Sequence, residues 1–201
     1  MSLNEKAHDL LSPLVGRTSA FLVSERGLKL SFARAILPHL AARGGGCRIF
    51  DLDAFFSSNL GEVTRNVPRA AVKNVELIIP EVGFDIESEI ADLFSDESDR
   101  ALIIDSTNTL NQLLASQKPR SASRELAFVF AALSNWARMN SRVVVANTYE
   151  RNPPIPRRAA TPFSRFFDLT ISVSQRVGGV SLHCRKGDVW AGRPFFLSFQ
   201  D

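Results

Sequence analysis

Several kinds of residue are scarce in this chain of 201 residues, and each scarcity excludes a class of protein. Its two cysteines, Cys47 and Cys184, cannot build a disulfide framework, and neither belongs to a Cys-x-x-Cys or Cys/His cluster. The three histidines are scattered, so we expect no metal centre built on them. No apolar run approaches the ~20 residues of a membrane span, and the polar N-terminus does not have the pattern of a signal peptide. We therefore expect a cytoplasmic protein with reduced thiols and no membrane partner.

The composition is that of an ordinary globular protein. Hydrophobic residues make up 45% of the chain and charged residues 22%, which excludes a disordered or fibrous protein. A chain of this length typically forms one domain. We expect an N-terminal amphipathic helix within residues 1–18 and a core domain over residues 19–201.

Charge is distributed unevenly along the chain, although the formal total is only +3. Residues 46–116 contain thirteen acidic and five basic side chains, whereas residues 117–165 contain two acidic and nine basic ones. Such a division suits a surface that meets phosphates or an acidic partner. The alternative is a solvated basic face with no ligand.

Strand-like and helix-like segments alternate through most of the chain. The apolar patterns predict strands at 20–23, 47–53, 75–79, 100–105 and 142–146, and helices at 30–42, 85–95 and 122–139. Three further strand-like runs follow at 167–174, 178–185 and 194–199, separated by short turns. Alternation of this kind predicts a parallel sheet with right-handed crossovers, and the tail predicts an antiparallel extension. Ligands of such sheets bind beyond the carboxyl ends of the strands.

Five segments of the chain, with two short motifs, carry a resemblance to a known family. The segments cover 21–34, 48–53, 101–106, 123–148 and 169–196, and the motifs are Leu102-Ile-Ile-Asp105-Ser106 and Arg185-Lys186-Gly187. Together the segments resemble the core of the RecA/Rad51/RadA superfamily, above all its short archaeal RadA paralogues and KaiC-like relatives. The first motif is similar to the family's Walker B strand, and the second is similar to a motif of a late RadA strand. The resemblance implies an α/β fold: a RecA-like, mostly parallel twisted sheet flanked by helices on both faces, with C-terminal antiparallel strands.

The segment after the first strand departs from the family's phosphate-binding loop. A working loop reads G-x-x-x-x-G-K-[ST], because glycines let backbone amides face the phosphates and the lysine reaches the β- and γ-oxygens. The chain has Ser24-Glu-Arg-Gly27-Leu-Lys29-Leu-Ser31. Gly27 and Ser31 agree with the motif, but Ser24, Lys29 and Leu30 replace its first glycine, last glycine and lysine. We expect no efficient ATP hydrolysis, no catalytic residue and no required cofactor.

The resemblance nevertheless assigns a remnant of a nucleotide site at this sheet edge. It comprises Ser24, Gly27, Lys29, Ser31, Asp53, Asp105 and Ser106. Asp53 falls where the family has the glutamate that activates water, and Asp105 could hold a magnesium-bound water. The alternative for both aspartates is that they cap the turn after their strand. Lys29 swung across the site would permit weak binding of ATP and magnesium.

Two basic segments correspond to the DNA-contacting loops of the recombinases. The resemblance places these loops at about 107–120 and 148–161. Arginine contacts phosphates or stacks on bases, and tyrosine offers a stacking face. The predicted DNA-binding residues are Lys118, Arg120, Tyr149, Arg151, Arg157 and Arg158. The alternative is an exposed, proline-stiffened loop without a ligand.

These features predict a non-catalytic RecA/RadA-like accessory protein of DNA recombination or repair. Its partners would be single- or double-stranded DNA, a catalytic recombinase, or both, and a homo-oligomer is left open. One alternative is a divergent KaiC-like ATPase with weak nucleotide binding. Another is an interaction module that binds a protein through the acidic residues of 81–99.

Overall fold

The computed structural model describes residues 10–43, 45–81, 85–95, 99–149 and 164–199. Its core is one sheet of eight strands in the order β3-β2-β4-β5-β1-β6-β7-β8. The first six strands in that order are mutually parallel, and β7 and β8 continue the sheet antiparallel. The strands are β1 (Arg17–Val23), β2 (Cys47–Asp51), β3 (Val75–Ile78), β4 (Ala101–Asp105), β5 (Val143–Tyr149), β6 (Leu169–Arg176), β7 (Gly179–Lys186) and β8 (Phe195–Ser198). The predicted fold class and the antiparallel tail are confirmed.

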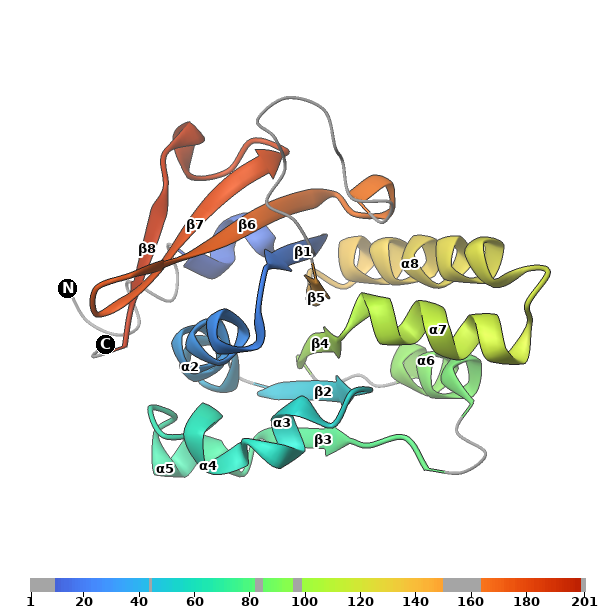
Figure 1. Ribbon diagram of the computed structural model, residues 1–201, viewed down its shortest axis with the longest axis horizontal. Helices are drawn as coiled ribbons and strands as arrows, with labels where there is room; N and C mark the ends of the chain where they lie inside the picture. Colours follow the sequence, from blue (N-terminus) through green and yellow to red (C-terminus); the bar gives the residue numbers. More distant parts are fainter. Residues whose placement is uncertain (1–9, 44, 82–84, 96–98, 150–163, 200–201) are drawn as a thin grey trace.

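Helices cover both faces of this sheet (Figure 1). One face carries α2, with α3, α4 and α5 beyond it, and the other carries α6, α7 and α8. The helices are α2 (Arg26–Ala41), α3 (Phe55–Ser58), α4 (Leu60–Val63), α5 (Arg69–Val72), α6 (Ile86–Ser95), α7 (Thr107–Gln117) and α8 (Ala122–Met139). Short 3₁₀ turns η1 (Ser12–Leu14), η2 (Ser164–Phe166) and η3 (Trp190–Gly192) complete the described elements. Within the part of the chain that the structure describes, every helix is too short or too polar to span a bilayer.

The central strands are apolar on both faces because a hydrophobic core lies on each side of the sheet. Side chains at alternate positions of β4 belong to different cores: Ile103 packs on the α2 side, and Leu102 and Ile104 pack on the α8 side. This burial on both faces gives parallel strands their continuous apolar runs. Consequently the sequence located these strands to within a few residues.

Several predicted helix boundaries require correction. The helix predicted at 30–42 begins at Arg26, and the segment predicted as a loop at 107–120 is helix α7 as far as Gln117. The Ser106 side chain caps α7 by accepting a hydrogen bond from the Thr109 amide, and Leu110 and Leu114 are the buried apolar residues of this mostly polar helix. The single-turn helices α3, α4 and α5 were not predicted. Residues 1–9 of the predicted N-terminal helix lie outside the described part, whereas Leu10, Leu11 and Leu14 are buried.

The run of glycines before β2 allows a close passage of the backbone. Gly46 has φ +80°, and a Cβ atom there would lie 2.2 Å from the Asn74 carbonyl oxygen. At the same place the Cys47 amide donates to the Asn74 carbonyl and the Ala101 amide donates to the Gly46 carbonyl, each over 2.9 Å. Only glycine fits this conformation without displacing the backbone that aligns β2 with β3 and β4.

Candidate functional site

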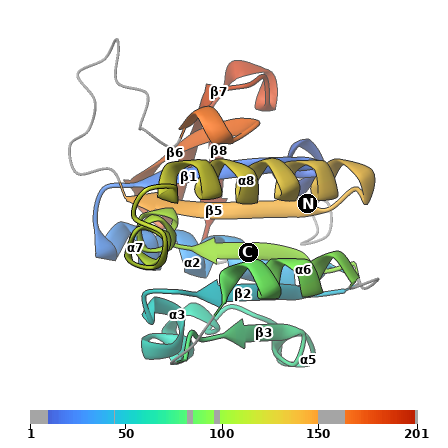
Figure 2. The same cartoon turned by 90° about the vertical axis from the view of Figure 1, so that its right-hand side faces the viewer.

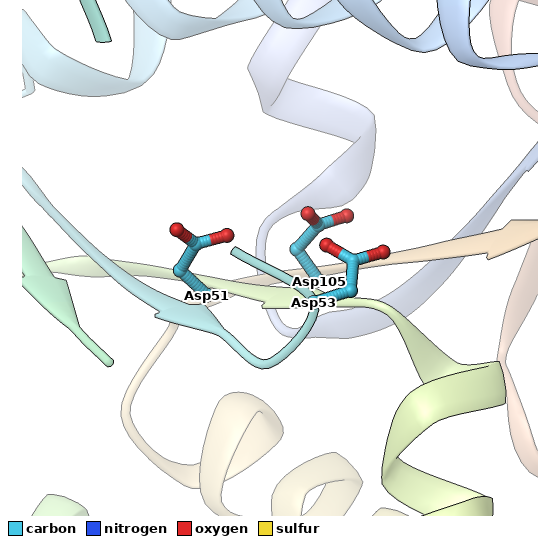
Figure 3. A group of neighbouring side chains, drawn as sticks. All are labelled: Asp51, Asp53 and Asp105. Atoms are coloured by element: carbon cyan, nitrogen blue, oxygen red, sulfur yellow. The ribbon is translucent and has the colours of Figure 1, made fainter. Parts of the chain in front are cut away.

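Three carboxylates lie at the carboxyl ends of β2 and β4. These strands are adjacent and parallel, with Asp51 paired in register with Asp105, and Asp53 follows two residues after β2 ends. Figure 3 shows the three side chains projecting from this one edge, Asp53 beside Asp105 and Asp51 further along. Asp53 and Asp105 therefore lie at one edge of the sheet, as expected.

The side chain of Lys29 meets this cluster from the first turn of α2. It is fully buried, and its Nζ lies 2.6 Å from Asp105 Oδ2 and 3.1 Å from Asp53 Oδ2. Two aromatic rings complete the enclosure, with Nζ 4.1 Å from the ring centre of Phe55 and 4.9 Å from that of Tyr149. A cation over ring faces gains further electrostatic stabilisation. Lys29 thus forms a buried ion pair within a box of carboxylates and rings.

The remaining oxygens of the aspartates are mostly bound by neighbouring amides. Asn147 Nδ2 donates to Asp105 Oδ1 over 2.9 Å. Asp51 accepts hydrogen bonds from the amides of Phe56 and Ser57, over 2.9 and 2.7 Å. Asp51 therefore caps the turn that starts α3, which is the structural role considered above as the alternative for its neighbour Asp53.

Burial and charge shift the protonation equilibria of the ion pair. Burial raises the pKa of Asp105 to about 7, although Lys29 and Asn147 act in the opposite direction. Burial lowers the pKa of Lys29, but the charges of Asp105 and Asp53 outweigh it, so the net pKa lies above its ordinary value. Lys29 consequently keeps its proton at neutral pH, and its ammonium compensates the carboxylates.

The same carboxylates are the only described group of acidic, histidine or cysteine side chains that comes close enough for a shared metal ion. Asp51, Asp53 and Asp105 each offer an oxygen, and these atoms lie within 4.8 Å of one another. Oxygen donors of this kind suit Mg²⁺. However, the Lys29 ammonium contacts two of the three carboxylates, and Asp51 is bound by amides. As arranged, the residues do not fit a divalent cation.

The connection between β1 and α2 is only two residues long. β1 ends at Val23 and α2 starts at Arg26, which leaves Ser24 and Glu25 between them. Gly27 and Ser31 are therefore helical, and a Cβ atom added at Gly27 would meet no other atom within 4 Å, so nothing there requires a glycine. A phosphate loop needs several consecutive amides that face the anion. Two residues cannot form one.

Tyr149 is the last residue of β5, and it belongs to the same box rather than to an exposed loop. It is partly buried, which raises the pKa of its hydroxyl. Asn108 on α7 holds its backbone: the Tyr149 amide donates to Asn108 Oδ1 over 2.8 Å, and Asn108 Nδ2 donates to the Tyr149 carbonyl over 3.5 Å. The ring that we expected to stack on bases therefore faces Lys29.

The other predicted DNA-binding residues lie elsewhere. Lys118 and Arg120 are exposed in the turn between α7 and α8. Since α7 has 11 residues and starts at the carboxylate edge, its far end is about 16 Å away, and Figure 1 shows α7 leading away from β4. Arg151, Arg157 and Arg158 fall outside the described residues. The structure thus brings together Lys29, Asp53, Asp105 and Tyr149, and separates them from Lys118 and Arg120.

Four residues of the site were not identified from the sequence: Asp51, Phe55, Asn108 and Asn147. Asn147 could have been found, because β4 and β5 were both predicted. A polar residue near the end of β5 is expected to lie beside Asp105 at the end of β4. Phe55 and Asn108 lie on α3 and α7, which the sequence did not predict, so no signal pointed to them.

Comparison with known proteins identifies the fold. No protein-family model matches the chain, and no curated protein matches its sequence. Among solved structures, one described as the crystal structure of the RadB recombinase superposes with a TM-score of 0.66. The match has 16% sequence identity and covers 94% of this chain and 92% of that one. Together with the strand order, this likeness establishes that the chain has a RecA-like fold.

Proposed function

We propose that the protein is a RecA-like accessory factor of DNA recombination or repair that does not hydrolyse nucleoside triphosphates. It acts by contacting DNA, a catalytic recombinase, or both. The observation that carries the proposal is the Lys29 ion pair, in which Nζ lies 2.6 Å from Asp105 and 3.1 Å from Asp53. The ammonium group of Lys29 thus occupies the two carboxylates that a nucleotide-bound metal ion would need as ligands.

Two further observations support a non-catalytic role. A two-residue connection stands in place of a phosphate loop, so the β- and γ-phosphates would have no cradle of amides. The side chain at the position of the catalytic lysine is Leu30, which cannot neutralise developing phosphate charge. Recombination or repair is supported by the likeness to the RadB recombinase structure.

We expect no hydrolysis of ATP above background. Phosphate release should be measured at saturating ATP and Mg²⁺, with and without single-stranded DNA, because DNA stimulates hydrolysis only where a competent site exists. Calorimetric titration with ATP, with and without Mg²⁺, provides a second readout. Turnover approaching ~1 per second would contradict the proposal and favour a divergent ATPase.

The DNA contact is tested through its dependence on salt. Binding that neutralises three to five phosphates of a single strand should give a slope of log K against log salt of about −2 to −3.5. Arg120→Ala should flatten this slope by about 0.7, because one phosphate contact is lost. Arg69→Ala is the matched control, since Arg69 is also exposed but lies on α5, across the sheet from α7. If the protein binds neither single- nor double-stranded DNA at low salt, the proposed DNA contact is wrong and the catalytic recombinase is the only proposed partner left.

A further inference from the structure

The outer face of α8 has an unusual pattern for a solvent-facing helix surface. The twelve residues from Leu126 to Ala137 include no charged side chain. The inner stripe of α8 accounts for only half of them, because it packs into the core through Leu126, Val129, Phe130, Leu133, Trp136 and Ala137. On the outer face, Phe128 is 67% exposed and Met139 is 75% exposed. Figure 2, which views that side of the molecule, shows α8 lying across the sheet with α6 beside it.

The exposed residues of α8 follow a helix-packing repeat. Apart from Ser123 in the first turn, they are Arg124, Phe128, Ala131, Asn135 and Arg138, with spacings of 4, 3, 4 and 3, and Met139 adjoins the last. A 4-3 spacing places side chains along one seam, which is the arrangement by which a second helix packs. Ala131 at the middle of the seam lets a partner backbone approach closely. The seam, defined as these six residues, is therefore shaped for a helix.

The charges at the ends of the seam indicate what that helix carries. Arg124 and Arg138 lie about 21 Å apart along α8, and the exposed Arg120 adds positive charge near the first of them. Asp168 is the one described acidic group paired with Arg138, at a separation of 3.7 Å. An apolar centre with basic ends is complementary to a helix with apolar residues in its middle and acidic residues at its ends.

Other occupants of the seam fit less well. A nucleic acid needs cations along its whole path, whereas the seam is uncharged between its two arginines. A second copy of the chain would place like charges together, since antiparallel α8 helices would bring Arg124 of one copy near Arg138 of the other. Parallel α8 helices would place each arginine beside the same arginine of the other copy. We propose that the α8 seam binds an acidic amphipathic helix of a different protein.

The proposal is tested with a synthetic peptide of 18 residues that has leucines at 4-3-4 spacing and glutamates at its ends and flanks. A matched peptide has lysine in place of every glutamate. Fluorescence anisotropy at low salt should detect the acidic peptide at roughly micromolar to submillimolar concentrations, typical of a small interface. The lysine peptide should bind at least about tenfold more weakly, because it meets like charges.

Variants of the protein distinguish the seam from other surfaces. Phe128→Ser and Arg124→Glu should each weaken binding of the acidic peptide about tenfold or more. Val177→Ser is the matched control, because Val177 is wholly exposed in the β6–β7 turn, away from α8. It should leave binding unchanged. Thermal melting checks that each variant folds, and Met139→Ser replaces Phe128→Ser if the latter does not.

Four results would overturn the proposal. The first is equal binding of the two peptides, and the second is binding of the acidic peptide that Phe128→Ser does not change. The third is displacement of the acidic peptide by a dT oligonucleotide whose own binding is lost in Phe128→Ser, which would assign the seam to nucleic acid. The fourth is a dimer in sedimentation equilibrium that Phe128→Ser dissociates, which would assign it to a second copy.

Discussion

Replacing Lys29 by methionine should lower the free energy of unfolding by about 3–5 kcal/mol, because the buried Asp105 loses its cation and must either stay charged in the core or take up a proton. Methionine preserves much of the volume, so the loss arises from charge rather than from a cavity. Lys29 is fully buried and lies 2.6 Å from Asp105, which is also fully buried. Urea unfolding followed by circular dichroism at pH 7 measures the change.

A second substitution separates charge from packing. Lys29→Met combined with Asp105→Asn removes both partners, so the double variant should be more stable than Lys29→Met alone. Equal instability of the single and double variants would mean that the ion pair is not the cause.

The instability of Lys29→Met should also depend on pH. Asp105 already has a pKa of about 7, above its ordinary value of 3.8, so the folded state holds this proton more tightly than the unfolded state. Its contribution to stability is therefore largest at low pH and declines as the pH rises towards 7. Loss of Lys29 raises the pKa of Asp105 further, so the deficit should be smaller at pH 5 than at pH 8. A deficit that does not vary with pH would contradict this account.

Asp168→Asn should cost about 2 kcal/mol, because Asp168 joins three elements. Its Oδ2 accepts hydrogen bonds from the amide and hydroxyl of Thr18 on β1 and from Ser134 on α8, each over 2.9 Å. A neutral asparagine oxygen accepts these bonds more weakly than a carboxylate oxygen, and the asparagine NH₂ group would replace the oxygen that lies 3.7 Å from Arg138. Chemical denaturation at pH 7 gives the change, and Asp188→Asn, at an exposed site after β7, is the control.

The effect of Asp168→Asn on acid stability has a defined sign. Burial alone would raise the pKa of Asp168, but the hydrogen bonds from Thr18 and Ser134 and the charge of Arg138 hold it below its ordinary value. Its contribution is thus present above the ordinary carboxyl pKa and is lost as the pH falls through the folded value. Wild type and variant should converge at low pH. A constant difference down to about pH 2 would show that the carboxylate charge is not responsible.

The sequence was informative wherever a structural element carries its own apolar pattern. Helix α8 was located at its observed bounds, because its buried stripe repeats over 18 residues. Helix α7 was missed because only Thr107, Leu110 and Leu114 are buried among its 11 residues. The single turns of α3, α4 and α5 are too short to show any period.

The candidate site was predicted in its backbone positions but not in its side-chain contacts. Asp53 and Asp105 were placed on one edge because the carboxyl ends of parallel strands coincide. The role of Lys29 depends on where α2 starts, and a start at Arg26 rather than near residue 30 turns its side chain into the box. Tyr149 likewise changed from an expected DNA contact to a neighbour of Lys29, since β5 extends three residues beyond its predicted end.

Because the cation at the carboxylate edge is covalently part of the chain, its local concentration is fixed once the chain has folded. A chelator cannot extract it, dilution cannot release it, and a change in the supply of magnesium leaves it in place. Tyr149, whose ring lies 4.9 Å from that ammonium, therefore has a permanent neighbour rather than one that arrives and departs. In a protein with an exchangeable ion, the occupancy of this edge would vary with the concentration of that ion, whereas here every folded molecule carries the same cation.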